Sequence, residues 1–350
     1  MPVKSFQSVS IIIPIRNESL NIRDGLAALF IQDYPYEVVE ILIADGMSTD
    51  DTRNIIHELA SAHSWQRIRI FDNAGKIVSA GMNIALRQAK GEIIIRIDGH
   101  TVVAADYVRQ CVDTLERTKA DNVGGKMNPV SKNVFGNAVA FATSSFFGIG
   151  GGRFHYSEKE EWVDTVYMGA WPRRVFEKIG LFDEELIRDQ DDEFNYRLRE
   201  RGGRILLSPN IRSEYKVRSR PRTLWLQYYQ YGFWKVRVLQ KHPHQMSLRQ
   251  FAPPSFVLAL LISIILAFFP AFYMLSIIVP LLYLLINLCA CLWIASRRSW
   301  SVLPYLPLVF AILHFSYGMG FWAGLFRFWN RWGDRNGITP QMPLDANERS

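Results

Sequence analysis

Short apolar runs alternate with amphipathic stretches along roughly the first 220 residues. The apolar runs are rich in β-branched side chains, which favour strands, and the stretches between them repeat their apolar positions at helical spacing. Strands are predicted at residues 9–15, 38–44, 67–71 and 92–98, and helices at 19–30, 51–62 and 76–88. This alternation is typical of an α/β domain with a mostly parallel sheet, which binds its ligands at the carboxyl ends of the strands.

The last third of the chain has a different pattern. Residues 252–296 contain no Asp, Glu, Lys, Arg or His. This run of 45 residues is more than twice the roughly 20 that a membrane-spanning helix needs. It therefore predicts two spans joined by a tight turn near Pro270.

A second apolar stretch, residues 302–326, contains His314 as its only ionisable side chain among these types. If it also spans, the C-terminus lies outside, whereas the basic residues Arg327, Arg331 and Arg335 favour the inside. The sequence therefore leaves open whether there are two or three spans.

Positive charge is concentrated just before the apolar run. The chain has 350 residues and a net charge of +7, and 12 Lys or Arg but only 2 Glu lie between Arg199 and Arg249. Aromatic residues such as Trp225 interleave with them, a pattern typical of a segment on an anionic cytoplasmic leaflet. Nucleic-acid binding is the competing interpretation, but the neighbouring spans favour the membrane, and we expect no nucleic-acid partner. Arg297 and Arg298 after the run also indicate the cytoplasmic side.

The cysteines and the N-terminus indicate a reducing compartment. Cys111, Cys289 and Cys291 match neither a disulfide framework nor a zinc-ligand spacing. The first apolar run, Ile11 to Ile13, is too short for a secretory signal. We therefore expect the N-terminal domain to stay in the cytoplasm.

Polar residues follow two of the predicted strands. Asp45 comes after one strand and is followed by small and hydroxyl residues, which suits recognition of a nucleoside; the alternative is an ordinary helix cap. Asp98 and His100 follow another strand and can share a divalent ion that bridges a diphosphate. The alternative there is a solvated turn.

A third group is acidic. Asp189, Asp191, Asp192 and Glu193 place four carboxylates within five residues at the start of a predicted helix. The helix macrodipole accounts for one or two of them. A cluster this dense favours a site at which one carboxylate is held as a general base.

Taken in chain order, these segments resemble the inverting family 2 glycosyltransferases of the GT-A fold. The matching positions are residues 10–18, Asp45 with 48–50, 98–100, 169–170 with 173–174, 180–184 and 190–198. The resemblance covers roughly residues 8 to 215. It implies an α/β catalytic domain with a Rossmann-like, mixed but mostly parallel sheet, followed here by C-terminal transmembrane helices.

The resemblance also implies roles for individual residues. Asp191 would be the catalytic base, and Asp98 and His100 would hold Mn²⁺ or Mg²⁺. The donor would be bound by Pro14, Asn17, Glu18, Asp45 and Asp98, and the acceptor by Gly169, Trp171, Gln230 and Trp234.

The sequence departs from the family pattern in three places. The usual Asp-x-Asp is Asp98-Gly99-His100, and the usual Glu-Asp pair is Gln190-Asp191. The Gln-x-x-Arg-Trp of processive synthases is Gln230 to Trp234 with Phe233 in place of Arg, which counts against chain building.

A catalytic domain followed by spans is similar to the succinoglycan-type exopolysaccharide glycosyltransferases. We therefore expect a multi-pass protein of the cytoplasmic membrane with a cytoplasmic catalytic domain. It would move a sugar from a nucleotide sugar, most simply a UDP-sugar, to a lipid-linked polyprenyl saccharide, and would contact membrane lipids. The expected regions are 1–220 catalytic, 221–250 interfacial, 251–326 transmembrane and 327–350 tail.

Two alternatives remain at this stage. A bare polyprenyl phosphate acceptor is already anionic and needs no general base, so the acid cluster around Asp191 counts against it. A membrane scaffold or channel subunit with a degenerate transferase domain is the other. The uncharged hairpin argues against a conduction path, and Asp45, Asp98 and Asp191 argue against degeneracy.

Overall fold

The computed structural model describes residues 6–63, 67–150, 152–244, 247–334 and 340–342. The chain divides into two compact units. The described residues of the first unit lie within 6–128, 156–215 and 340–342, and those of the second lie within 129–155 and 216–334. The expected boundary at 220 lies close to the observed one, but the inclusion of residues 129–155 with the membrane helices was not expected.

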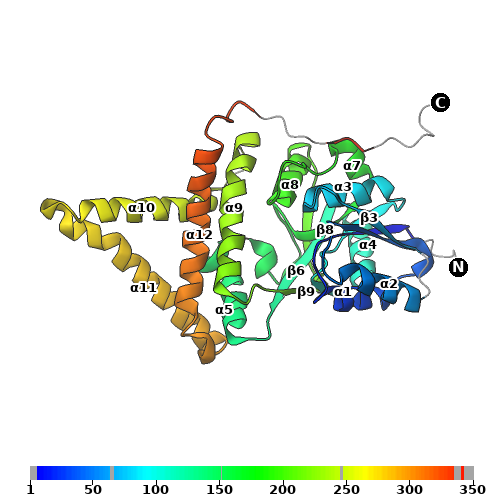
Figure 1. The fold of residues 1–350 in the computed structure, drawn as a ribbon, viewed down its shortest axis with the longest axis horizontal. Coiled ribbons are helices and arrows are strands. Elements are labelled where there is room, and N and C mark those ends of the chain that lie inside the picture. Colours follow the sequence, from blue (N-terminus) through cyan, green and yellow to red (C-terminus); the bar gives the residue numbers. More distant parts are fainter. Residues whose placement is uncertain (1–5, 64–66, 151, 245–246, 335–339, 343–350) are drawn as a thin grey trace. The chain divides into compact units, whose positions relative to one another are not determined.

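The first unit is built on a mixed sheet (Figure 1). In the part of the chain that is described, eight of the nine strands follow the order β3-β2-β1-β4-β8-β6-β9-β5, and the ninth, β7, pairs with β9. The strands are β1 (Val9–Ile15), β2 (Val39–Asp45), β3 (Ile68–Asp72), β4 (Ile93–Arg96), β5 (Thr101–Val103), β6 (Asn122–Val130), β7 (Glu161–Trp162), β8 (Tyr167–Pro172) and β9 (Ile205–Lys216). β1 to β4 are parallel, as the sequence predicts, whereas β8 joins β4 in the antiparallel direction.

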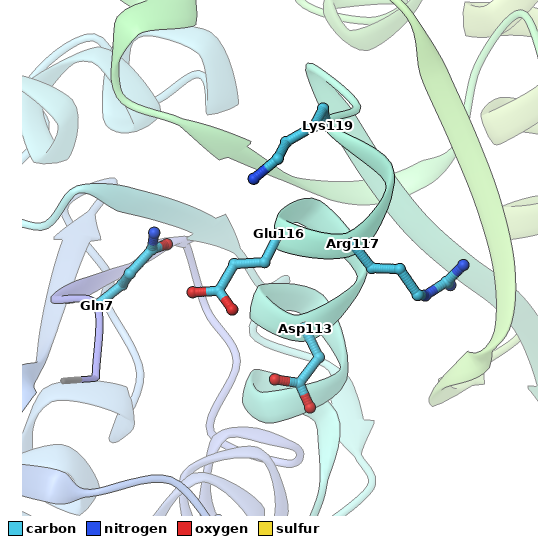
Figure 2. A pocket seen from close by; sticks show the side chains of 5 residues that line it. All are labelled: Gln7, Asp113, Glu116, Arg117 and Lys119. Atoms are coloured by element: carbon cyan, nitrogen blue, oxygen red, sulfur yellow. The ribbon is translucent and has the colours of Figure 1, made fainter. Parts of the chain in front are cut away.

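The helices of this unit connect and cover the strands. They are α1 (Ile22–Phe30), α2 (Thr52–Ala62), α3 (Val78–Gln88), α4 (Tyr107–Thr118), α7 (Arg174–Ile179) and α8 (Gln190–Glu200). The first three agree with the predicted helices to within three residues at either end. An open hollow of about 560 Å³ beside α4 is lined by Gln7, Asp113, Glu116, Arg117 and Lys119 (Figure 2). It lies near the start of β1, away from the residues that follow the carboxyl ends of the strands.

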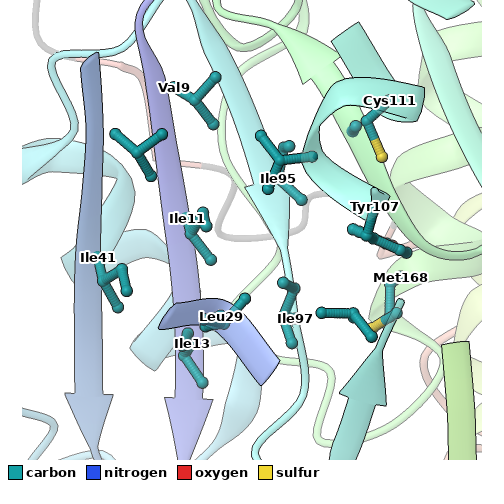
Figure 3. Close-up of a cluster of buried hydrophobic side chains, with 14 of the residues drawn as sticks. Val9, Ile11, Ile13, Leu29, Ile41, Ile95, Ile97, Tyr107, Cys111 and Met168 are labelled. Atoms are coloured by element: carbon teal, nitrogen blue, oxygen red, sulfur yellow. The ribbon is translucent and has the colours of Figure 1, made fainter. Parts of the chain in front are cut away.

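Apolar side chains of the central strands form the core of the first unit (Figure 3). All seven residues of β1 are buried, as expected for a central parallel strand covered on both faces. Pro14 is tolerated there because β4 pairs with β1 only as far as Ile12. The strand order reverses between β1 and β4, so a crevice is expected beyond their carboxyl ends.

The second unit is helical. Its helices are α5 (Val134–Thr143), α6 (Phe146–Ile149), α9 (Pro221–Lys241), α10 (Ala252–Leu266), α11 (Tyr273–Arg297) and α12 (Leu306–Arg327). The predicted turn near Pro270 is confirmed, since a short 3-10 helix from Pro270 to Phe272 joins α10 to α11. Three segments, 248–266, 270–297 and 306–327, are long and apolar enough to cross a membrane.

Glycines bring α9 and α12 into close contact along their lengths. A Cβ atom on Gly320 would lie 2.0 Å from the carbonyl oxygen of Tyr229, and one on Gly232 would lie 2.0 Å from that of Tyr317. Small residues allow this approach of two helix backbones. The two helices run side by side in Figure 1.

The basic side chains within α9 differ from the expectation of a charged membrane-facing surface. Lys235, Arg237 and Lys241 are at most 5% exposed. Arg237 pairs with Asp334 at 3.0 Å. These three residues are therefore not available to attract anionic lipid, in contrast to the exposed Arg222.

Candidate active site

Asp98 and Asp191 meet at one buried arginine. Arg96 ends β4 and is 5% exposed. Its Nε donates a hydrogen bond to Asp98 Oδ1 at 2.9 Å, and its Nη1 donates to Asp191 Oδ1. Burial alone would lower the pKa of Arg96, but the two carboxylates raise it above its usual value. A permanent cation therefore links the end of β4 to the start of α8.

The environment of Asp191 suits proton transfer. Burial raises the pKa of Asp191 to about 6, and the Asp98 and Asp192 carboxylates add to the rise while Arg96 opposes it. About a third of the side chain, 35%, is exposed, so a substrate can reach it. A carboxylate with a pKa close to neutral pH can accept a proton during a reaction.

Glu193 of the acid cluster has different surroundings from Asp191. Glu193 is 1% exposed and pairs with Arg197, whose Nε lies 2.6 Å from Glu193 Oε1. Arg197 also donates hydrogen bonds to the carbonyl oxygens of Ile179 and Leu181. This pair anchors α8 to the preceding segment and explains part of the acid cluster as structural.

His100 lies beside the loop that follows β1. Its Nδ1 is 3.3 Å from Glu18 Oε1, and its ring packs against Tyr215 with the centroids 5.3 Å apart. Asn21 donates a hydrogen bond to the other Glu18 oxygen at 3.0 Å. Glu18 and His100, predicted as donor and metal residues, are thus brought together at the crevice between β1 and β4.

Asn17 joins the loops that follow β1 and β2. It has a positive φ of 55°, a conformation that Asn tolerates better than most residues. Its amide N–H donates to Ser48 Oγ at 2.8 Å, and its side-chain oxygen accepts from the amide of Thr49 at 2.9 Å. Asn17 therefore fixes the loop that was predicted to bind a nucleoside.

Asp45, which was predicted to recognise a nucleoside, is enclosed by protein groups. Its side chain is 0% exposed. The amide of Ser48 donates to it, and Arg53 pairs with it and with Asp72 at the end of β3. Asp45 thus holds Ser48 and Arg53 in place.

The side chains near Asp98 suit a metal ion whose ligands come partly from the protein and partly from the substrate. Asp98 and His100 lie in one loop and supply a carboxylate and an imidazole. In the part of the chain that is described, no group of three His, Cys, Asp or Glu side chains could hold an ion by itself. Magnesium-type ions are commonly bound by one or two protein carboxylates together with substrate phosphates and water. The residues therefore fit a metal bound together with a diphosphate.

Trp171 and Gly169, which were predicted to bind the acceptor, are packed against other residues of the first unit. Trp171 is 2% exposed and packs against Phe176, Phe182 and Phe194, with centroid distances of 5.6 to 6.2 Å. A Cβ on Gly169, whose φ is 122°, would lie 2.5 Å from the Trp171 ring. The prediction for Trp171 is corrected accordingly: an enclosed indole has no face to offer an acceptor.

The other two lie on α9 in the second unit. Trp234 is half-buried and packs against Phe233 and Phe328, with centroids 5.6 and 5.7 Å away. Gln230 is also half-buried on the same helix. Their acceptor role stays a prediction.

Sequence reasoning missed two arginines of the site. Arg96 could have been identified from the sequence, because a charged residue in an otherwise apolar strand needs a buried partner. Arg53 could not, since it lies at an ordinary polar position of α2. Its link between Asp45 and Asp72 depends on the pairing of β2 with β3.

The fold and these strand-end residues define a glycosyltransferase of the GT-A type. Residues 10–180 match the family model for glycosyl transferase family 2. The chain belongs to this family, and it is an inverting glycosyltransferase that depends on a nucleotide sugar.

Two relatives extend the similarity through the helical unit. A dolichyl N-acetyl-α-D-glucosaminyl phosphate 3-β-D-2,3-diacetamido-2,3-dideoxy-β-D-glucuronosyltransferase of Methanococcus voltae is 30% identical over 91% of this chain and 97% of its own length. The succinoglycan biosynthesis protein ExoA of Rhizobium meliloti is 30% identical over 92% and 96%. Both alignments cover nearly all of each chain, so the similarity is not confined to the catalytic domain.

A solved structure supports the fold. The mannosyltransferase PcManGT from Pyrobaculum calidifontis, determined with GDP-Man and Mn²⁺, superposes with a TM-score of 0.56. It is 20% identical and the match covers 89% of this chain and 88% of that one. The three long apolar helices indicate in addition that the protein is membrane-associated.

Proposed function

We propose that this glycosyltransferase transfers a sugar from a nucleoside diphosphate sugar, most simply a UDP-sugar, to a hydroxyl group of a lipid-linked saccharide. The observation that carries the proposal is the contact of Arg96 with both Asp98 and Asp191. Through this contact Asp98, predicted to bind the donor, and Asp191, predicted to be the base, are separated by a single arginine side chain. Direct displacement at the anomeric carbon requires this proximity.

In the proposed reaction Asp191 accepts the proton of the acceptor hydroxyl. The oxygen attacks the anomeric carbon as the bond from that carbon to the phosphate oxygen breaks. The electron pair of that bond leaves with the nucleoside diphosphate. Attack opposite to the leaving group inverts the anomeric configuration, in keeping with the family.

On the donor side, Asn17 and Asp45 hold the loop at Ser48 and Thr49 against which the nucleoside would bind. Pro14 lies one residue before the end of β1, where it is paired with Ala44 of β2. We assign a divalent ion, Mn²⁺ or Mg²⁺, to Asp98 and His100, with Glu18 beside His100. When bound, such an ion stabilises negative charge on the departing diphosphate.

The lipid-linked acceptor is supported by the relatives and by the helices. The Methanococcus voltae protein is named for a dolichyl N-acetyl-α-D-glucosaminyl phosphate acceptor. An acceptor with a polyprenyl tail stays in the bilayer, so anchoring the enzyme there raises the effective concentration of the acceptor. We propose a multi-pass protein of the cytoplasmic membrane whose catalytic domain faces the cytoplasm.

A bare polyprenyl phosphate is the second candidate acceptor. It would receive the sugar without a general base, because its phosphate is already anionic. The raised pKa of Asp191, to about 6, favours a hydroxyl acceptor that does need one.

The decisive experiment is Asp191→Asn in purified protein reconstituted in lipid. We expect transfer to a hydroxyl acceptor to fall by on the order of 10²-fold or more, while donor binding measured by calorimetry changes little. Asp192→Asn is the matched control and should retain most of the activity. Loss in Asp192→Asn alone would move the base, and unchanged transfer by Asp191→Asn to polyprenyl phosphate would favour the second candidate.

The metal assignment has its own test. Dialysis against EDTA should abolish activity, and Mn²⁺ should restore it at least as well as Mg²⁺, because imidazole nitrogen favours manganese. Binding of Mn²⁺ in the presence of UDP, followed by electron paramagnetic resonance, should weaken in Asp98→Ala and His100→Ala. Full activity without metal, or unchanged Mn²⁺ binding in Asp98→Ala, would contradict the site.

A further inference from the structure

The three apolar helices of the second unit differ in how much of their surface is free. In the most apolar 18-residue window of each segment, 17% of 248–266 and 17% of 270–297 is buried, against 50% of 306–327. The exposed large apolar side chains of α12 are Leu308, Met319 and Phe326, which fall on one side of the helix at helical spacing. A helix with one free apolar stripe and a covered opposite side differs from one that lipid surrounds.

The covered side of α12 carries α9. Leu224 near the start of α9 packs in the same cluster as Leu306 and Val309 near the start of α12. At the far ends, Gln240 of α9 donates a hydrogen bond to the carbonyl oxygen of Phe328 at 2.6 Å. The two helices therefore run parallel, and the glycine contacts at Gly232, Gly320 and Gly324 hold them together between these points.

α9 cannot cross a bilayer. The uncharged stretch from Thr223 to Trp234 contains 12 residues, which as a helix extend about 18 Å, against a hydrocarbon core of about 30 Å. Arg222 lies before it, and Lys235 and Arg237 follow. Since the glycine contacts lock α12 to α9, a crossing by α12 would draw the charges of α9 into the hydrocarbon.

α10 packs on the same side of α12 as the free stripe, between its exposed side chains Leu308, Met319 and Phe326. Trp322 Nε1 donates to the carbonyl oxygen of Pro254 at 2.9 Å, and Phe315 packs on Phe256 at 5.4 Å. α11 returns to the first half of α12, where Asn287 donates to the carbonyl oxygen of Pro307 at 3.3 Å. Between these contacts the two helices project sideways from the pair of α9 and α12 (Figure 1).

Resting on the membrane association in the proposed function, we propose that only α10 and α11 enter the bilayer core and that α12 lies with α9 in the membrane interface. Its stripe of Leu308, Met319 and Phe326 faces the acyl chains at shallow depth. Both ends of α12 are then on the same side of the membrane. Arg327 and Arg331 share that side with Arg297, as the distribution of positive charge favours.

The polar contacts of His314 agree with this position. His314 is the ninth residue of α12, and its Nε2 lies 2.8 Å from the carbonyl oxygen of Phe147. Its Nδ1 lies 3.1 Å from the hydroxyl of Tyr283. An interfacial depth places this network near polar head groups rather than in the hydrocarbon.

The first test is single-cysteine labelling in a background in which Cys111, Cys289 and Cys291 are replaced, and each variant must elute from size-exclusion chromatography like the wild type. Ser299→Cys and Asn330→Cys flank α12. When a membrane-impermeant maleimide is applied to intact cells and then to permeabilised cells, the two positions should behave alike. Both should be labelled only after permeabilisation. Labelling of one position from outside and the other only after permeabilisation would overturn the proposal.

The second test measures depth. Nitroxide labels are placed at Leu308→Cys, Met319→Cys and Phe326→Cys in nanodiscs. The ratio of oxygen accessibility to that of a polar nickel reagent should be the same at all three positions. Labels at Met274→Cys, Leu284→Cys and Leu292→Cys on α11 should instead show a graded depth. A comparable gradient along α12 would mean that it crosses.

Neither readout depends on sugar transfer. If both flanks of α12 were labelled from outside, the cytoplasmic orientation in the proposed function would be wrong, whereas the interfacial position of α12 would stand.

Discussion

At the scale of single residues, Arg96 determines how the two carboxylates of the site are arranged. A buried ion pair contributes little net stability, because removing the charges from water offsets their attraction. Its value is geometric, since a planar guanidinium fixes the directions of the oxygens that it contacts. Arg96 thereby orients Asp191 toward the same crevice as Asp98.

Replacing Arg96 should change the pH dependence of turnover. In Arg96→Ala the Asp191 carboxyl loses the cation that lowers its pKa, while Asp98 and Asp192 still raise it. The acid limb of the kcat profile should move to higher pH, and kcat at pH 7 should fall by about tenfold or more. Arg96→Lys should restore part of the shift. An unchanged pH profile in Arg96→Ala would contradict the role.

The wild-type enzyme should itself lose activity on acidification. Asp191 must be deprotonated to act as a base, and its pKa is raised to about 6. Turnover should therefore be high above pH 7 and fall as the pH decreases through about 6. A kcat profile at saturating metal and donor measures this. A limb near pH 4, typical of an ordinary aspartate, would show that the pKa is not raised.

At the scale of elements, local signals and long-range pairing differ in what can be predicted. β1 to β4 and α1 to α3 follow the sequence pattern, because strand and helix periodicity is local. The antiparallel strands β6, β8 and β9 were not predicted, since their pairing joins segments far apart in the chain. The contact of Arg96 with Asp191, 95 residues away, depends on the same pairing.

The close contact of α9 with α12 gives a prediction for stability. In Gly320→Ala the new methyl group would lie 2.0 Å from the carbonyl oxygen of Tyr229, so the helices must separate. We expect a loss of about 1–3 kcal/mol, measured by thermal unfolding in nanodiscs. Gly333→Ala, with no neighbouring atom within 4 Å, is the matched control and should be neutral. Equal stability of the two variants would contradict the packing.

At the scale of the whole molecule, the sequence indicated the membrane helices but not their arrangement. Residues 252–296 were recognisable because they lack charge, whereas α12 is as apolar as a span and is covered by α9. The segment 129–155 lies inside the sequence of the catalytic domain yet belongs to the helical unit. Hydropathy records composition, and which surfaces are covered depends on tertiary packing. Arg335 lies outside the described residues, so Arg327 and Arg331 carry the charge argument at this end.

The exposed arginines before α9 should govern the preference of the protein for anionic lipid. Arg218, Arg220 and Arg222 are exposed, in contrast to the buried basic residues within α9. Each basic residue close to an anionic leaflet contributes about 1 kcal/mol, so neutralising three should weaken the electrostatic part of membrane docking by on the order of 10²-fold. We expect transfer activity to be higher in vesicles that contain phosphatidylglycerol than in pure phosphatidylcholine, and the variant with all three changed to Gln should lose this preference. Changing the exposed Lys90, Lys119 and Lys159 of the first unit to Gln removes the same charge and should leave the preference intact. Loss of the preference in both variants would assign the effect to net charge, and loss in neither would exclude these arginines as the lipid contact.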